Sequence, residues 1–234
     1  PFIHIPVLFP HLLTNPKTTW LRKSEPVPGL NGRPMFFPSG KVLGGSSSIN
    51  GMLYIRGQAQ DFDDWRDAGN NGWGWEDVLP YYKKMENHAH GGNDDHGVGG
   101  PITVTNTELS NESSNKFLES AVAAGIPRIS DLNTGDQFGI STVQGTIRNG
   151  LRNSTAVGYL KGAKKRSNLT IRTGANVQRI ILDGNHASGV EFVDQNGKNV
   201  TLHAGREIIL SASAVGSPQI LLQSGIGDGP QSVS

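Results

Sequence analysis

A run of small residues between two apolar segments is the first part of the sequence that suggests chemistry. Leu43-Gly-Gly-Ser-Ser-Ser-Ile-Asn50 precedes the apolar stretch Met52-Leu-Tyr-Ile55. Glycine has no Cβ, so the backbone at Gly44 and Gly45 can approach a pyrophosphate or a flavin ring closely, and Ser46 and the helix start after it can donate hydrogen bonds. The same run can also simply turn the chain and cap a helix. The residues alone leave both interpretations open.

Histidines and carboxylates gather in a second segment. His88, His90 and His96 lie close in sequence to Asp94 and Asp95, and imidazole and carboxylate groups are suitable zinc ligands. The glycines around them are typical of a flexible, solvated loop, which is the interpretation we favour. We therefore assign no metal ligand. A metal-binding module, which would retain its metal through dialysis, stays as an alternative.

Three helices and a short strand are expected in the first two thirds of the chain, on the basis of apolar spacing and of acidic residues at helix starts. Before them, prolines are so frequent in residues 1–38 that we expect a wrapped connection with little regular structure. The expected helices cover residues 61–68, 75–87 and 113–124, and the expected strand covers residues 102–105.

The last third reads as a β-meander that returns to an α/β layer. Asn196-Gly197 is a strong hairpin signal, and residues 207–211 are typical of a buried parallel strand. A helix is expected from Pro218, with Ser217 as its N-cap and Gly225 as its stop. The β-branched runs that predict the meander cover residues 169–172, 177–182, 189–193 and 200–203. The expected fold class is therefore α/β (mixed α+β).

Composition excludes several classes of protein. The 234 residues carry 21 Lys+Arg against 20 Asp+Glu, a net charge of +1, so no polybasic arm for nucleic acid is expected. The absence of cysteine excludes disulfides, thiolate metal sites and a cysteine nucleophile. No apolar run approaches the roughly 18 residues of a membrane span, so no transmembrane segment is expected. The compartment is left open, with the cytoplasm favoured.

Two segments, residues 40–61 and 213–227, resemble the two sequence signatures of the glucose-methanol-choline (GMC) family of flavin alcohol oxidoreductases, in the same order and at about the same separation. The subgroup most similar to the chain contains bacterial choline-dehydrogenase-like and primary-alcohol dehydrogenases. Intervening segments that resemble the family's approach, lid and return are residues 28–33, 56–57, 61–65, 72–75 and 149–160.

Two features of the family pattern do not occur in the sequence. No G-x-G-x-x-G follows a strand, although the family's dinucleotide fingerprint has this form. The family's C-terminal half, which supplies the active-site histidine, is not matched either. We therefore expect the chain to be an internal piece of a longer enzyme. Its seven histidines match no catalytic position of the family, so no catalytic residue is assigned.

The resemblance implies FAD as the cofactor. Besides Gly44 and Gly45, it places five residues along the flavin and one at the adenine. Some family members attach the flavin covalently to a histidine where this chain has Ile49, so non-covalent binding is expected. The residues implied to lie along the flavin are Ser46, Asn50, Gly51, Met52 and Leu53. Val177 is the position whose main chain meets the adenine, and for Val177 the residue-based alternative is ordinary core packing.

The resemblance also implies a domain plan and a reaction. The chain would be a partial FAD-binding domain with lid helices and part of the substrate domain: residues 1–90 the FAD-binding segment and lid, 91–148 substrate domain or connection, and 149–234 the return to the FAD-binding domain. The implied reaction oxidises the CH–OH group of a small choline-like or primary alcohol, with hydride passing to flavin N5. The electron acceptor is not indicated. The alternative is a catalytically inactive, truncated remnant with weak or no flavin binding.

Overall fold

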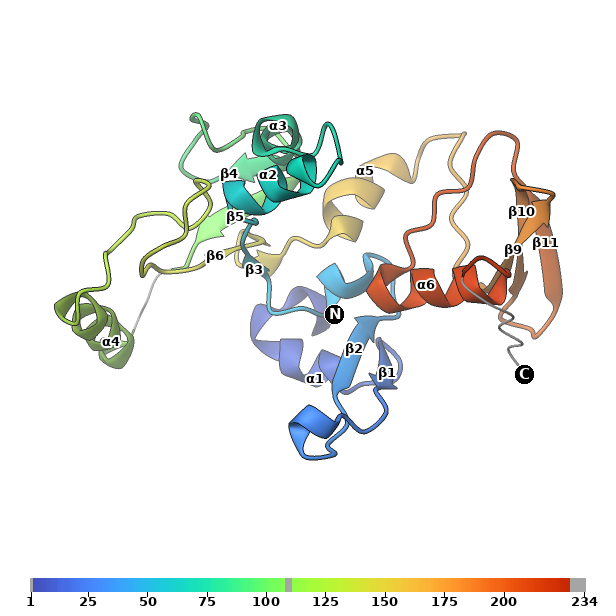
Figure 1. The fold of residues 1–234 in the computed structure, drawn as a ribbon, viewed down its shortest axis with the longest axis horizontal. Coiled ribbons are helices and arrows are strands. Elements are labelled where there is room, and N and C mark those ends of the chain that lie inside the picture. Colours follow the sequence, from blue (N-terminus) through green and yellow to red (C-terminus); the bar gives the residue numbers. More distant parts are fainter. Residues whose placement is uncertain (1, 108–110, 228–234) are drawn as a thin grey trace. The chain divides into compact units, whose positions relative to one another are not determined.

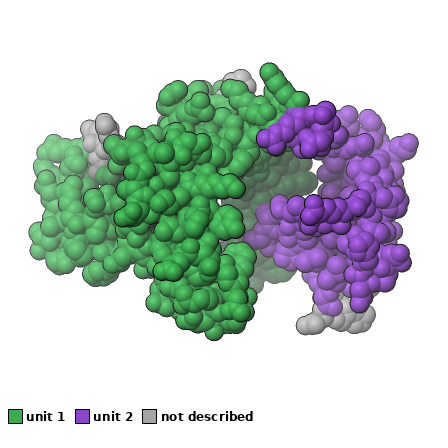
Figure 2. All heavy atoms as spheres, turned by 90° about the horizontal axis from the view of Figure 1, so that it is seen from above, with its two compact units in different colours: residues 1–165 green, residues 166–234 purple. Residues whose placement is uncertain are grey.

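The computed structural model describes residues 2–107 and 111–227 (Figure 1). By packing, the chain divides into two compact units, Pro1–Lys165 and Arg166–Ser234 (Figure 2). The mixed α/β fold class is confirmed, because each unit combines helices with antiparallel sheet. The expected three segments, at 1–90, 91–148 and 149–234, divide the chain by family role rather than by packing, and stay a prediction.

The proline-rich start of the chain contains more regular structure than expected. Short helical turns at Phe2–His4 (η1) and Pro6–Leu8 (η2) lead into α1 (Phe9–Leu13). An antiparallel ribbon follows, made of β1 (Thr19–Lys23) and β2 (Phe36–Gly40). The expectation failed because a two-stranded ribbon has only edge strands, in which a proline such as Pro38 can lack its donor without interrupting a ladder.

A four-stranded sheet forms the core of the first unit. Its order is β3-β6-β5-β4, in which β4 and β5 are parallel and the other neighbours are antiparallel. Tyr54, Ile102 and Val104 pack together on it, with Met85 against them. The strand expected at residues 102–105 is confirmed. The strands are β3 (Leu53–Tyr54), β4 (Glu86–His88), β5 (Ile102–Asn106) and β6 (Gln144–Gly145).

The three expected helices of this unit are confirmed. In α2 (Ala59–Asp67) and α3 (Trp75–Met85) an aspartate at the third helical position accepts a hydrogen bond from the N-cap amide, as in a capping box. The ring of Phe62 joins the two helices, with centroids 5.7 Å from Trp75 and 6.0 Å from Tyr82. The third helix, α4 (Glu112–Ala123), begins at a capping Asn111.

A hairpin and a helical turn close the first unit. The hairpin pairs β7 (Ile147–Arg148) with β8 (Leu151–Arg152). The π-helical turn η5 (Ala156–Leu160) and α5 (Lys161–Ala163) follow it.

The second unit is the expected meander with a helix against it. The strands lie in the order β11-β10-β9, and the Asn196-Gly197 hairpin is confirmed, with Gly197 at φ 77°. The helix α6 (Ser213–Gln223) contacts β9, where the Ile180 amide donates to Ser224 Oγ at 2.8 Å. The strands are β9 (Asn176–Asp183), β10 (His186–Val193) and β11 (Asn199–His203).

Three expectations for this region were wrong. Residues 169–172 and 207–211 form no strand, and Ile209 is 79% exposed. A buried parallel strand needs partner strands beside it, and none of the strands in the described part of the chain pairs with residues 207–211. The helix begins at Ser213, so Ser217 and Pro218 lie inside it. Ser217 Oγ accepts from the Ala212 amide at 3.0 Å.

None of the helices described for this chain has both the length and the apolar composition needed to cross a membrane.

Candidate functional site

The Gly-Ser segment follows β2 as a short 3-10 helix, η4 (Gly45–Ser48). Gly44 and Gly45 both have left-handed backbones, at φ 87° and 53°, which other residues adopt only with strain. A Cβ on Gly44 would lie 2.5 Å from Ser48 Oγ, whereas a Cβ on Gly45 would meet no atom within 4 Å. Gly44 is therefore required by packing within the protein, and Gly45 faces open space.

The three serines of this segment have different partners. Ser48 is buried and donates to the Leu43 carbonyl at 2.8 Å. Ser47 donates to the Gly44 carbonyl at 2.6 Å and accepts from the Thr155 amide at 3.0 Å. Ser46 is exposed, and its oxygen accepts from the Gly40 amide at 3.1 Å. Only the Ser46 hydroxyl hydrogen is thus free to donate to a ligand.

The next turn is held in a strained conformation. Met52 is buried and has φ 63°, a value that is uncommon for a residue with a side chain. Its amide donates to Asn50 Oδ1 at 3.1 Å, and its carbonyl accepts from the Thr146 amide at 2.9 Å. Leu53, which follows, is 64% exposed. A Cβ on Gly51 would be in ordinary contact, at 3.7 Å from the Phe9 ring.

Gly44 to Leu53, which contains seven of the eight predicted cofactor residues, is one continuous segment of the first unit. Val177 lies in β9 of the second unit, partly buried and paired with Phe192. At the position of covalent attachment, Ile49 is 1% exposed and has no nucleophilic atom. The segment fits a flavin nucleotide, because it offers space beside Gly45, the Ser46 hydroxyl and the exposed Asn50 amide.

Arg152, on β8, supports this segment, and the sequence analysis did not identify it. Its side chain is 1% exposed, and burial lowers its pKa. Nη1 donates to the Ser47 carbonyl at 3.1 Å and to Asn50 Oδ1 at 2.8 Å, and Nε donates to the Ile3 carbonyl at 2.8 Å. Asn50 and Arg152 are 102 positions apart, so no local pattern could have indicated the contact.

The histidine segment is not a solvated loop. His88 and His96 are 7% and 2% exposed, whereas His90 and Asp94 are exposed. His96 lies between two carboxylates, with Nδ1 3.0 Å from Glu86 Oε2 and Nε2 3.0 Å from Asp131 Oδ2. The expectation of a solvated loop was wrong because the buried Glu86 and the partly buried Asp131 give His96 hydrogen-bond partners inside the protein.

Glu86 is itself paired inside the protein. Arg56 Nη2 lies 2.8 Å from Glu86 Oε2, and both side chains are fully buried. Arg56 also donates to Tyr54 Oη at 3.1 Å and to the Asp95 carbonyl at 2.8 Å. The carboxylate of Asp95, which the sequence had suggested as a ligand, plays no part in the cluster; Asp131 does.

The hydrogen bonds also assign the proton on His88. Asn133 Oδ1 accepts from the Arg56 amide, so Asn133 Nδ2 donates to Gln144 Oε1 at 2.7 Å. Gln144 Nε2 must then donate to Asp131 Oδ2 at 2.8 Å and to His88 Nε2 at 3.2 Å. The proton of His88 is therefore on Nδ1, which has no partner among the described residues. Burial, and next the charge of His96, lower the pKa of His88.

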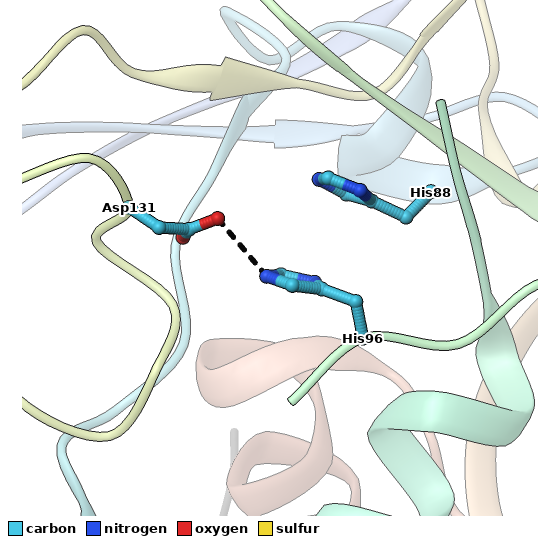
Figure 3. A group of neighbouring side chains, drawn as sticks. All are labelled: His88, His96 and Asp131. Carbon is cyan, nitrogen blue, oxygen red and sulfur yellow. Dashed lines mark hydrogen bonds and ion pairs between the residues drawn. The ribbon is translucent and has the colours of Figure 1, made fainter. Parts of the chain in front are cut away.

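Ligand atoms of His88, His96 and Asp131 lie within 4.8 Å of one another (Figure 3). The two rings are stacked, with centroids 4.1 Å apart and planes 21° from parallel. Imidazole lone pairs lie in the ring plane, so nearly parallel rings cannot both reach one ion at the ~2.0–2.1 Å of a zinc–nitrogen bond. The cluster as it stands is a hydrogen-bonded polar core, and a metal would require one ring to rotate.

Known proteins are similar to the chain over nearly its whole length. A family model for GMC oxidoreductases matches residues 15–234. The oxygen-dependent choline dehydrogenase of Rhizobium johnstonii is 43% identical over 230 residues, which are 98% of this chain and 41% of that protein. The chain therefore spans less than half the length of this curated relative.

Solved structures extend the similarity to the fold. Pyridoxine 4-oxidase from Mesorbium loti has a TM-score of 0.91 at 35% identity, covering 97% of this chain and 44% of that one. An FAD-dependent oxidoreductase from Chaetomium thermophilum has a TM-score of 0.84 at 28% identity, covering 89% and 39%.

Proposed function

Because the chain belongs to the GMC oxidoreductase family, we propose that it forms the flavin-cradling part of an FAD-dependent enzyme that oxidises the CH–OH group of a small alcohol. The observation that carries the proposal is the contrast between its two adjacent glycines. Gly44 is packed against Ser48, whereas the left-handed Gly45 faces open space. A backbone exposed in this way can approach a flat, polar cofactor closely.

The chain's own residues bind and orient the cofactor. Gly45 lets the backbone approach it, and the Ser46 hydroxyl and the Asn50 amide donate hydrogen bonds to it. The main chain of Gly51 to Leu53 continues this contact, and the main chain of Val177 meets the adenine. When bound, FAD supplies the hydride acceptor.

Hydrogen bonds within the protein hold the Asn50 side chain in place before the cofactor binds. The Asn50 side chain is held by Arg152 and by the Met52 amide, so it does not need to be ordered when the cofactor binds. No residue of the described chain is assigned as the base that takes the hydroxyl proton.

The substrate class we propose is a choline-like or primary alcohol. Support comes from the relative named oxygen-dependent choline dehydrogenase, to which nearly the whole length of this chain is similar. Anaerobic addition of choline or of a primary alcohol to the complete gene product should bleach the flavin absorbance. A flavin that stays oxidised with every alcohol offered would contradict the proposed reaction.

Flavin binding should be non-covalent, because Ile49 has no nucleophile and its side chain is buried. The complete protein should purify yellow, and acid precipitation should release all of the flavin into the supernatant. Absorbance of the supernatant and of the redissolved pellet measures this. Flavin that stays in the pellet would show an attachment at another residue.

A further inference from the structure

Basic residues from the β7–β8 hairpin, α5 and η1 line a cavity of about 550 Å³ in the first unit. Arg148 and Arg152 come from the β7–β8 hairpin, Lys161 and Lys164 from α5 and the residue after it, and His4 from η1. No Asp or Glu is among the described residues that line it. Four cations at one cavity are a strong local concentration on a chain whose net charge is only +1.

The buried member of this group lacks a counter-charge. Arg152 makes no ion pair with any described residue, and its Nη2 is buried with no hydrogen-bond partner. Arg56, which is equally buried, is paired with Glu86 at 2.8 Å. Burying a charge without a partner is costly, so an anion bound in the cavity that Arg152 lines would stabilise the protein.

Arg152 also connects the cavity to the flavin segment. Its Nη1 donates to the Ser47 carbonyl and to Asn50 Oδ1, and Arg152 is also one of the residues that line the cavity. An anion that fixes the guanidinium would therefore also fix the turn that positions Asn50.

We propose that this cavity binds a phosphate group, and that the bound phosphate steadies the Gly44 to Leu53 segment through Arg152. Guanidinium and ammonium groups around one cavity suit an anion with several acceptor oxygens. The phosphate belongs either to the diphosphate of the cofactor or to a separate phosphate compound. The link to the flavin rests on the proposed function, whereas binding of the anion does not.

The test uses the complete gene product with Lys161→Gln and Lys164→Gln combined. Both lysines are exposed, and glutamine has a similar helix propensity, so the variant should fold. Titration calorimetry with inorganic phosphate on the flavin-free protein should show saturable binding, and the double variant should bind at least about tenfold more weakly. Lys84→Gln, which changes an exposed lysine of α3, should bind phosphate like the wild type.

A second titration, on the flavin-loaded protein, identifies the source of the phosphate. If FAD blocks phosphate binding, the cofactor's diphosphate occupies the cavity, and the double variant should also release FAD faster. If phosphate binds alongside FAD, the cavity takes a separate phosphate compound. No saturable binding to the flavin-free protein, or equal affinity in the wild type and the double variant, would overturn the proposal. A yellow protein with that result would leave the proposed function intact.

Discussion

At the scale of single residues, the flavin assignment rests on the open space that a Cβ at Gly45 would enter. Gly45 and Gly184 have nearly the same backbone, at φ 53° and 57°, and a Cβ at either position meets no protein atom within 4 Å. Valine should therefore strain the backbone similarly at both sites. Any difference between the two variants reports on something outside the described chain, such as a bound cofactor.

We predict that Gly45→Val in the complete protein abolishes flavin retention, because a branched side chain pushes the cofactor away from the backbone. Gly184→Val, in the turn between β9 and β10, should keep its flavin. The ratio of flavin to protein after gel filtration measures both. If Gly45→Val keeps stoichiometric FAD, or if Gly184→Val loses it equally, the Gly44 to Ser46 segment is a plain turn.

His88 should make stability depend on pH. Its pKa is lowered by burial and by His96, despite the opposing charges of Glu86 and Asp131 and with a small further lowering from His90. The unfolded histidine has a pKa near 6.5, so the unfolded state binds the proton first as pH falls. The contribution of the neutral, buried His88 to the free energy of unfolding is therefore fully present above about pH 6.5. It decreases as the pH falls below this value and levels off below the pKa of the folded state.

Urea unfolding of the complete protein at about pH 7.5 and 5.5 measures this effect. His88→Gln keeps an acceptor for Gln144 but cannot titrate, so the loss of stability between the two pH values should be smaller than in the wild type. His90→Gln, at an exposed neighbouring position, should behave as the wild type does. Identical pH slopes in wild type and His88→Gln would refute the assignment.

At the scale of elements, the buried Arg56–Glu86 pair joins β4 to the segment between β3 and α2. Arg56→Met should lower the free energy of unfolding by about 3–5 kcal/mol, because it removes the arginine of the buried ion pair and leaves the Glu86 carboxylate with only His96 and the Gly97 amide as partners. Replacing Glu86 by leucine as well should not recover the loss, because His96 Nδ1 and the Gly97 amide then lose their buried partner. Arg66→Met is the matched control, since Arg66 also lies 2.8 Å from an aspartate oxygen, of Asp63, but on the surface.

Denaturant midpoints of the three variants decide the point. The surface variant should change stability little, because exposed ion pairs are screened by water. A similar loss in Arg56→Met and Arg66→Met would mean that the buried pair has no special weight.

Helices and turns that are determined by neighbouring residues could be predicted from the sequence. Strands and buried side chains that depend on partners distant in the sequence could not. The acidic Glu76 and Asp77 at the start of α3, or the turn at Asn196-Gly197, set a helix or hairpin locally. Residues 207–211 have the composition of a buried strand but lack a partner strand in the described chain. His96 is buried because Glu86 and Asp131, which are 10 and 35 positions away in the sequence, lie within hydrogen-bond distance of its ring. The glycines around His96 had instead indicated a solvated loop.

At the scale of the whole molecule, the proposed cofactor residues are divided between two compact units. Gly44 to Leu53 belong to the unit that ends at Lys165, and Val177 belongs to the unit that begins at Arg166. A ligand that binds both units stabilises the folded protein, by about 2.7 kcal/mol at a hundredfold excess over Kd. It also opposes any opening of the connection between them, whereas a ligand of one unit alone does not.

Trypsin can probe the connection between the two units, because Lys164, Lys165 and Arg166 are consecutive, exposed cleavage sites. We predict that removing FAD from the complete protein speeds cleavage here severalfold, since cleavage needs local opening. Cleavage at Lys198, exposed in the turn before β11 within one unit, should change less. Time courses followed by mass spectrometry give both rates. If FAD leaves cleavage at the connection unchanged while the flavin is bound stoichiometrically, then the cofactor contacts only one unit, and the role proposed for Val177 is wrong.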